Sequence, residues 1–315
     1  MPHLVASPTP FETAILQAVA YASIFEYPLT VDEVQQTLVE YRASLAEVQA
    51  LCRSSSWLQE RVEFRHGFLF PVGCTRLVEQ RRSREAASRT FLASQRVMLR
   101  VLCLLPFVRL LAISGSLAHL NAGHQADLDL FIVTRGRRVW SVTLAIVLLS
   151  KLLGRRRTIC ANFVMSDTRL GLKEKDQQDL FAANQVIHLK PLVGADLCAA
   201  FVRANPFVTA WYPTFAGWSE LPLAVRPGPA LSRAKRAVEW LLAIPSLGAE
   251  WVSRRVYGWY LRRQVGRWRS PEQVRLDADY LKLHTQSHRG SVLDRYEAAV
   301  AAMARPDAAA SRIAV

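Results

Sequence analysis

The N-terminal part of the chain carries the hydrophobic spacing of short amphipathic helices. Residues 11–27, FETAILQAVAYASIFEY, repeat apolar positions every three to four residues and end before a proline. Two further helices are predicted by capping boxes, in which a hydroxyl residue is followed three positions later by glutamate. These pairs are Thr30 with Glu33 and Ser44 with Glu47. The pattern therefore predicts three short helices.

Alternating polar and apolar residues follow these helices. Residues 57–73, WLQERVEFRHGFLFPVG, alternate about the turn sequence RHG, which predicts a β-hairpin. Three helices and a hairpin predict a winged-helix-like domain over residues 1–73. Such domains often bind DNA, but the candidate recognition helix at residues 44–56 has only Arg53 as a basic residue. A structural or partner-docking role is the alternative.

The middle of the chain changes from one long helical pattern to alternating strands and helices. Residues 75–103 are rich in arginine and keep helical spacing, which predicts one long helix within a linker at residues 74–105. The next segments are predicted as strand, helix, strand, helix and strand, at residues 107–114, 115–119, 128–134, 137–154 and 156–166. Because elements in this order build a sheet with flanking helices, we expect a core domain over residues 106–190.

The C-terminal region, residues 191–315, is predicted to be mainly helical and interrupted by prolines. Six of the eight tryptophans lie there: Trp211, Trp218, Trp240, Trp251, Trp259 and Trp268. The predicted fold class is therefore α+β. We expect a small mixed sheet with flanking helices, preceded by the winged-helix-like domain and followed by the helical C-terminal region.

Composition and charge limit the partners and the compartment. The chain has 315 residues and a net charge of +14, and residues 221–270 supply ten Arg or Lys against two Glu, which is +8 of that excess. A basic surface attracts nucleotides, nucleic acid or lipid head groups. Scattered cysteines without paired spacing favour a reducing compartment. No secretory signal pattern is present, and the longest apolar stretch, residues 139–153, is too short to span a membrane, so we expect a cytoplasmic protein.

Two aspartates lie one residue apart at the start of the predicted strand 128–134. Side chains alternate along a strand, so Asp127 and Asp129 are expected on the same face. Two such carboxylates repel one another unless a cation lies between them, and Mg²⁺ favours carboxylate oxygens together with substrate phosphates. Upstream, Gly115 allows the backbone to approach a ligand closely, and Ser116 is expected to cap the short helix and to face a phosphate. The pattern predicts a site for a metal ion and a triphosphate.

Residues 115–134, GSLAHLNAGHQADLDLFIVT, resemble the Gly-Ser followed by Asp-x-Asp motif of the DNA polymerase β-like nucleotidyltransferase superfamily. The predicted elements over residues 107–165 follow the order of its core, a small mixed sheet with flanking helices. Further segments resemble a bacterial branch of uncharacterised nucleotidyltransferase-domain proteins: ASIFEYPLT, GFLFPVG, LLPFVRLLAISGSLA, ICANFVMS, LKPLVG and VRLDADYLKLH. The resemblance covers most of the sequence and implies a nucleotidyltransferase-like core.

This resemblance implies roles for individual residues. Gly115 and Ser116 would contact the β and γ phosphates of a nucleoside triphosphate (NTP). Asp127 and Asp129 would be the catalytic residues and would hold Mg²⁺ or Mn²⁺. In the superfamily, attack on the α-phosphate releases pyrophosphate, and the metals stabilise the attacking and leaving oxygens.

The sequence departs from the superfamily pattern on the following strand. Many members carry a third carboxylate there, which helps to bind the catalytic metal and can accept the proton of the nucleophile. This chain has Cys160, Ala161 and Asn162 at that place. Asn162 can offer a neutral carbonyl to a metal or nucleotide but cannot act as a base. Asp167 lies beyond the strand, where a turn or cap role is expected.

Structural alternatives exist for the aspartates and the nearby histidines. Asp127 and Asp129 could form a solvated strand edge that pairs with arginines such as Arg135 or Arg137. His119 and His124 lie between the turn and the aspartates, and a surface or helix-end position is expected for them rather than metal ligation.

Three other polar residues are candidates of a different kind. His284 and His288 are four residues apart and could share a helix face as zinc ligands, but no carboxylate motif accompanies them. Lys190 could reach a phosphate, and an ordinary surface lysine is the alternative.

The Arg- and Trp-rich segment at residues 233–269 allows three interpretations. Arginine stems could cover a helical surface whose tryptophans form the core. Arginines with aromatic neighbours could instead bind nucleic acid. The third interpretation is a peripheral membrane face, because Trp and Arg both suit lipid head groups.

The sequence favours a Mg²⁺-dependent nucleotidyltransferase that moves a nucleoside monophosphate from an NTP to an unidentified acceptor. The alternative is a non-catalytic regulatory or scaffold protein that keeps this fold to bind nucleotide, nucleic acid or a partner. An acceptor pocket is expected between the core and the helical C-terminal region.

Overall fold

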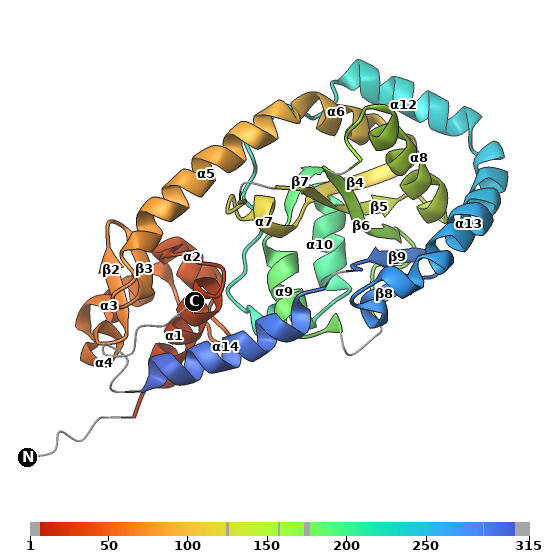
Figure 1. Cartoon of the computed structure of the whole chain (residues 1–315). Helices are drawn as coiled ribbons and strands as arrows, with labels where there is room; N and C mark the ends of the chain where they lie inside the picture. Colours follow the sequence, from red (N-terminus) through yellow and green to blue (C-terminus); the bar gives the residue numbers. More distant parts are fainter. Residues whose placement is uncertain (1–6, 124–125, 157, 173–176, 286, 306–315) are drawn as a thin grey trace, which may run out of the picture.

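The computed structural model describes residues 7–123, 126–156, 158–172, 177–285 and 287–305, and it confirms the α+β class. The described residues form a three-stranded sheet and a six-stranded sheet, with helices packed around both (Figure 1). His124 falls outside these residues, so its predicted position at a surface or helix end stays a prediction. No described helix combines the length and the apolar character needed to cross a bilayer.

Short elements build the N-terminal unit, residues 10–71. In chain order they are α1 (Pro10–Ser23), β1 (Leu29–Thr30), α2 (Val31–Gln36), α3 (Leu45–Ser54), α4 (Ser56–Gln59), β2 (Val62–Arg65) and β3 (Phe68–Pro71). Both predicted capping boxes are present, as is the predicted hairpin, β2 and β3, which turns at His66 and Gly67 with positive φ angles. Strand β1 pairs with β3 on the other side.

The predicted long helix is in fact divided at Gln95, into α5 (Arg76–Ser94) and α6 (Arg96–Leu104). The N–H of Gln95 bonds to the carbonyls of both Phe91 and Leu92, which tightens the last turn of α5. The two helices differ in their packing, since α5 is mostly polar whereas α6 turns a strongly apolar face, with Leu99 and Leu102, onto the core. The prediction of one uninterrupted helix was therefore wrong.

The six-stranded sheet has the order β7-β4-β5-β6-β9-β8. Its strands are β4 (Val108–Ile113), β5 (Leu128–Thr134), β6 (Ile159–Ser166), β7 (Lys190–Val193), β8 (Val274–Leu276) and β9 (Tyr280–Leu283). Strands β5 and β6 are parallel and the other neighbours are antiparallel. The helices α7 (Gly115–Ala118) and α8 (Val139–Leu152) follow β4 and β5 as predicted, and the chain turns after α8 at Gly154 (φ +67°).

Helices cover both faces of this sheet because its strands alternate apolar side chains to either side. One face packs on α6, α8 and α13 (Pro245–Arg263) through residues such as Ile113 and Ile132. The other face packs on α9 (Leu180–Ile187), α10 (Ala195–Arg203) and α11 (Phe207–Trp211) through Ala112 and Val133.

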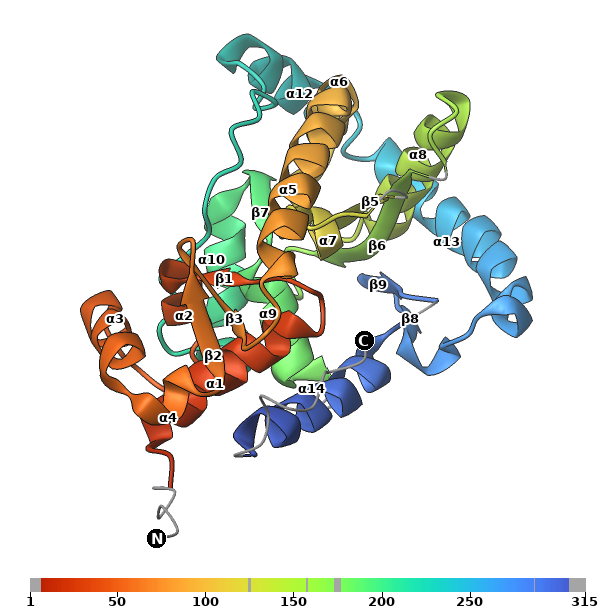
Figure 2. The same ribbon diagram turned by 60° about the vertical axis from the view of Figure 1, so that its left-hand side comes forward.

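The last helix, α14 (Arg289–Ala304), returns to the N-terminal unit and packs along α1 (Figures 1 and 2). The Arg295 guanidinium donates to the carbonyl of Ile24 at 2.8 Å. Helices α1 and α14 are thereby held together beside the central sheet.

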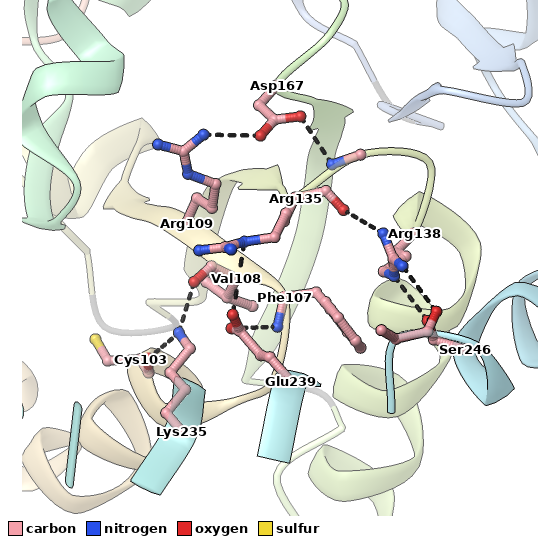
Figure 3. Close-up of polar contacts among 12 residues, drawn as sticks. Cys103, Phe107, Val108, Arg109, Arg135, Arg138, Asp167, Lys235, Glu239 and Ser246 are labelled. Carbon is pink, nitrogen blue, oxygen red and sulfur yellow. Dashed lines mark hydrogen bonds and ion pairs between the residues drawn. The ribbon is translucent and has the colours of Figure 1, made fainter. Parts of the chain in front are cut away.

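Two acidic side chains and one lysine fasten α12 (Pro229–Leu241) and α13 to the core, and Figure 3 shows those of α12, Lys235 and Glu239. Lys235 Nζ donates to the carbonyls of Cys103 (2.9 Å) and Val108 (2.6 Å), and the Glu239 carboxylate accepts from the N–H of Phe107 (2.8 Å). Glu250 accepts from the N–H of Trp140, at the start of α8. These contacts use polar groups where helix packing normally uses apolar ones.

The interpretation of the tryptophans as a core covered by arginine stems is wrong for three of them. Trp240, Trp251 and Trp259 are each more than half exposed on α12 and α13. The reason is that the inward faces of these helices carry the polar anchors, which leaves the indoles on the outside.

Candidate functional site

A cavity of about 1020 Å³ lies between the N-terminal unit, the central sheet and the segment that leads into α14. Its wall contains all the residues that the sequence singled out as a site, namely Gly115, Ser116, Asp127, Asp129 and Asn162. Cys160 lines the same wall. Residues from the loop after β4 and from the starts of β5 and β6 thus meet at one surface.

Asp127 and Asp129 lie at the start of β5 and face this cavity together. Asp127 directly precedes the strand, and Asp129 is its second residue, opposite Cys160 of the parallel strand β6. One oxygen of each carboxylate and the Cys160 Sγ lie within 4.8 Å of one another. Among the described residues, these three form the one group of histidines, cysteines or acids close enough to share a metal ion.

The carboxyl group of Asp129 is unusually costly to ionise. Its burial and the neighbouring charge of Asp127 raise the pKa of Asp129 from 3.8 to about 7, while a hydrogen bond from the Asn162 side-chain amide acts in the opposite direction. A cation beside both carboxylates would remove the repulsion and favour their ionised form. The pair therefore has the electrostatic character of a cation site.

The turn after β4 lies directly against Asp129. Gly115 has φ +67°, and a Cβ atom at this position would collide with Asp129 Oδ2 and lie 3.3 Å from the Cγ atom of Asp129. The N–H of Ser114 donates to the carbonyl of Asp129 at 2.9 Å, which holds the two segments together. Only glycine fits here without displacing the carboxylate.

Ser116 is exposed and lines the cavity, but it does not cap α7 as we expected. The N-cap residue is Ser114, because α7 begins at Gly115, and no side-chain cap bond forms there. The Ser116 hydroxyl is thus free of a capping role on the cavity wall.

Cys160 was passed over by the sequence analysis, which singled out Asn162 two positions later. Alternate residues of a strand share a face, and this spacing could have drawn attention to the thiol. Its Sγ lies 3.7 Å from Asp127 Oδ2. Burial and the negative charges of Asp129 and Asp127 raise the pKa of Cys160 to about 12, so the sulfur is protonated near neutral pH.

Asp167 lies outside the cavity, which confirms its predicted turn role. Its carboxylate accepts from Arg109 at 2.8 Å and from the N–H of Gly136 at 2.7 Å (Figure 3). Arg135, one expected partner of the strand-edge aspartates, pairs instead with Glu239 at 3.5 Å. That part of the solvated-edge interpretation is wrong.

The candidate histidines have structural neighbours. His119 caps the C-terminal end of α7, as expected for a helix-end residue, and packs on His188 with ring centroids 4.1 Å apart. His284 follows β9 and His288 precedes α14, so the expectation that they share a helix face is wrong. Both nevertheless line the cavity, and burial lowers the pKa of His284 to about 4.

Lys190 does not line the cavity, although the sequence allowed it to reach a phosphate. It begins strand β7, and its Nζ donates to the Ser219 hydroxyl. Burial lowers the pKa of this lysine.

The N-terminal unit and α14 supply much of the cavity wall that the sequence analysis did not predict. Aromatic side chains from these parts of the chain and from the helices beside the sheet include Tyr21, Phe25, Tyr27, Phe181 and Tyr212. Arg295 adds positive charge at the wall, whereas Arg84 forms an ion pair with Glu26, which also lines the cavity. No local sequence signal joins these positions, because they lie on segments that are distant in the sequence and meet only in the folded chain.

Comparison with protein-family models, with curated proteins and with solved structures gives no match to this chain. The interpretation of the cavity therefore depends on its own geometry and chemistry.

Proposed function

We propose that the chain is a Mg²⁺-dependent nucleotidyltransferase that binds an NTP in this cavity and transfers the nucleoside monophosphate to an acceptor. The observation that carries the proposal is the position of Asp129. Its carboxylate lies beside that of Asp127 and directly over the turn at Gly115. Two carboxylates that can bind a cation and a turn whose backbone a ligand can approach therefore lie on the same wall of the cavity.

The donor set suits Mg²⁺ rather than a closed metal cage. Two carboxylates on one side leave room for water and phosphate oxygens, which Mg²⁺ prefers as its remaining ligands. A raised pKa of Asp129 is expected when two carboxylates lie close together without a cation between them. When bound, the metal would stabilise negative charge on the attacking and leaving oxygens of phosphoryl transfer.

The turn is suited to phosphate because its backbone is accessible. With no Cβ at Gly115, a phosphate can approach the main chain beside Asp129, and the exposed Ser116 hydroxyl can donate to a phosphate oxygen. These contacts are the ones that the Gly-Ser motif implies. Asn162 donates to Asp129 and so orients that carboxylate.

The cavity is large enough for a nucleotide. Its volume of about 1020 Å³ lies at the upper limit of about 300–1,000 Å³ for ligand pockets. We assign the acceptor to the region between the central sheet and the N-terminal unit, which the aromatic side chains of Tyr21, Phe25 and Tyr27 line. The helical C-terminal region, expected to border this pocket, contributes Tyr212, the segment around His284 and residues of α14.

A second candidate is favoured by one observation. Asn162 and Cys160 occupy the strand where the superfamily pattern has a third carboxylate, and neither offers a base at neutral pH. This candidate is a nucleotide-binding regulatory or scaffold protein that keeps the fold without the reaction.

Calorimetry with each of the four NTPs, in MgCl₂ and in EDTA, tests the binding site. We expect wild type to bind an NTP only with Mg²⁺, and the double variant Asp127→Asn, Asp129→Asn to bind it at least about tenfold more weakly. Asp196→Asn, an exposed aspartate on α10, is the matched control. Unchanged NTP affinity in the double variant would reject the site.

Pyrophosphate release separates the two candidates. Labelled NTP is incubated with the protein and cell extract, and the double variant gives the background. Release that depends on Asp127 and Asp129 supports the transferase. Tight Mg²⁺-dependent NTP binding without release supports the binding protein.

A further inference from the structure

Helices α12 and α13 form the outer edge of the molecule, on the side away from the N-terminal unit (Figure 1). We call their exposed side chains and those of the segment that follows, within residues 229–269, the outer rim. Trp240 and Ile244, at the corner between the helices, are 78% and 82% exposed. Around them lie further exposed apolar side chains: Leu231, Val238, Leu241, Leu242, Leu247, Trp251, Val252, Val256, Trp259, Tyr260 and Val265.

Helices α12 and α13 differ from helices that only cover a core. A surface helix normally turns its apolar stripe inward. Here the inward face of α13 carries Ser246, Glu250 and Ser253 besides Tyr257 and Leu261, and the inward face of α12 carries Glu239. Many large apolar side chains of the two helices are exposed. A contiguous exposed apolar patch of this kind marks an interaction surface.

The rim is also strongly basic. Eight arginines between residues 229 and 270 are exposed, and none forms an ion pair with a described residue: Arg233, Arg236, Arg254, Arg255, Arg262, Arg263, Arg267 and Arg269. The acidic residues of this stretch, Glu239 and Glu250, are both buried against the core. No negative charge therefore offsets the arginines at the surface of this stretch.

The end of α8 extends the same surface. Helix α8 packs alongside α13 and leaves Leu148, Leu152 and Leu153 more than half exposed. Lys151 and Arg155 are exposed next to these leucines. Exposed apolar and basic side chains thus occur on α8 as well as on α12 and α13, and Figure 2 shows the position of these helices.

We propose that the outer rim binds the surface of an anionic lipid bilayer, with its Trp, Leu and Ile side chains inserted at the level of the head groups. Such a surface offers both an apolar layer and negative charge, which match the two features of the rim. The proposal is independent of nucleotide binding.

The observations disfavour two other occupants. Nucleic acid binds exposed aromatic rings by base stacking, but Trp251 and Trp259 already carry Arg255 and Arg263, with guanidinium carbons 4.8 and 3.8 Å from the ring centroids. The exposed aliphatic side chains have no role in such binding. A second copy of the chain would bring two sets of unpaired arginines together, and like charges repel.

Co-sedimentation of the full chain with vesicles tests the proposal. Wild type is expected to pellet with phosphatidylcholine vesicles that contain roughly one third phosphatidylglycerol, much less with phosphatidylcholine alone, and less as the salt concentration rises. The pair Trp240→Asp, Ile244→Asp removes the apolar corner. The pair Arg255→Gln, Arg263→Gln removes two charges and should lower the partition coefficient about 30-fold, at about 1 kcal/mol per charge.

Matched controls lie on other surfaces. Phe64→Asp changes an exposed apolar residue of β2, and Arg82→Gln with Arg96→Gln removes two exposed charges from α5 and α6. These variants should pellet as wild type does. If the apolar-corner variant does not fold, the arginine pair decides alone.

Four outcomes would overturn the proposal. These are failure of wild type to pellet, equal pelleting with neutral vesicles, equal effects of rim and control variants, and dimerisation or single-stranded RNA binding through the rim without vesicle binding.

Discussion

The backbone of Gly115 lies against the carboxylate of Asp129, so closely that a Cβ atom at Gly115 would collide with Asp129 Oδ2. Gly115 begins α7 just after β4, Asp129 lies on the neighbouring antiparallel strand β5, and the bond from Ser114 N–H to the Asp129 carbonyl fixes their spacing. The identity of residue 115 thus controls where a cation ligand lies.

Gly115→Ala should destabilise the protein and displace Asp129. Alanine is strained at φ +67° and adds the collision with the carboxylate, so the free energy of unfolding should fall by about 2–4 kcal/mol. The stabilisation by Mg²⁺ with NTP should also be lost. Urea denaturation with and without these ligands measures both effects.

Gly154→Ala is the control for this variant. Gly154 has the same φ of +67°, but nothing lies within 4 Å of a Cβ placed there. Gly154→Ala should lower the free energy of unfolding only by the backbone strain, about 1 kcal/mol. It should still be stabilised by Mg²⁺ with NTP. Equal losses in the two variants would show that contact with Asp129 contributes nothing.

Asp129→Asn should stabilise the metal-free protein at pH 8. Since burial and Asp127 raise the folded-state pKa of Asp129 to about 7 from 3.8, the stability it contributes is full below pH 4 and is lost as the pH rises through 7. The variant removes this loss, so its free energy of unfolding in EDTA should be higher by on the order of 1–2 kcal/mol. Its Tm should rise by a few degrees.

The difference in Tm between this variant and wild type should shrink as the pH is lowered from 8 to 5. Buried histidines titrate in both proteins and therefore cancel in the comparison. A variant with a lower Tm than wild type at pH 8, or a difference that does not change with pH, would contradict the prediction.

Asn162→Asp should strengthen binding of Mg²⁺ alone. A carboxylate at this position lies beside Asp129 and adds a third negative charge to the cluster, so we expect affinity to rise by about tenfold or more. Calorimetry with MgCl₂ measures it. Asn162→Ala removes the amide without adding charge and should bind no more tightly than wild type. If the two variants have the same affinity, residue 162 is not close enough to act on the ion.

Lys235→Met should loosen α12 from the core. The variant leaves the carbonyls of Cys103 and Val108 without their charged donor, which should lower the free energy of unfolding by about 1–3 kcal/mol. Urea denaturation measures the change. Lys151→Met, at an exposed site on α8, should change it by less than about 0.5 kcal/mol. If Lys235→Met leaves the free energy of unfolding unchanged, other contacts hold α12 on the core.

Sequence patterns predicted the elements that local physics decides. The capping boxes at Thr30 and Ser44, the hairpin turn at His66 and the end of α8 near Gly154 depend on neighbours within a few residues. The strands β4, β5 and β6 were predicted because each is a long apolar run.

The strands β7, β8 and β9 were missed for the opposite reason. They are short, β7 contains Pro191 at the edge of the sheet, and the turn between β8 and β9 is polar. Strand β7 pairs with β4 and β9 pairs with β6, both distant in the sequence, which no local pattern encodes.

One wall of the candidate site could likewise be predicted from the sequence, and the opposite wall could not. Gly115, Asp127 and Asp129 could be predicted together because β4 and β5 are consecutive and antiparallel, so their neighbouring ends meet. The opposite wall, with Tyr21 and Arg295, could not, because it depends on α14 packing along α1.

The pairing of β6 with β9 has a consequence for the order in which the protein is made. Strand β6, with Cys160 and Asn162, emerges from the ribosome long before β9, whose Lys282 pairs with Phe163. Until then the nascent strand has an open edge that other chains can pair with, and the cavity lacks the wall around His284. The site is therefore completed only after β9 and α14 have been made, so that a chain terminated before β9 carries both aspartates without the cavity wall around His284.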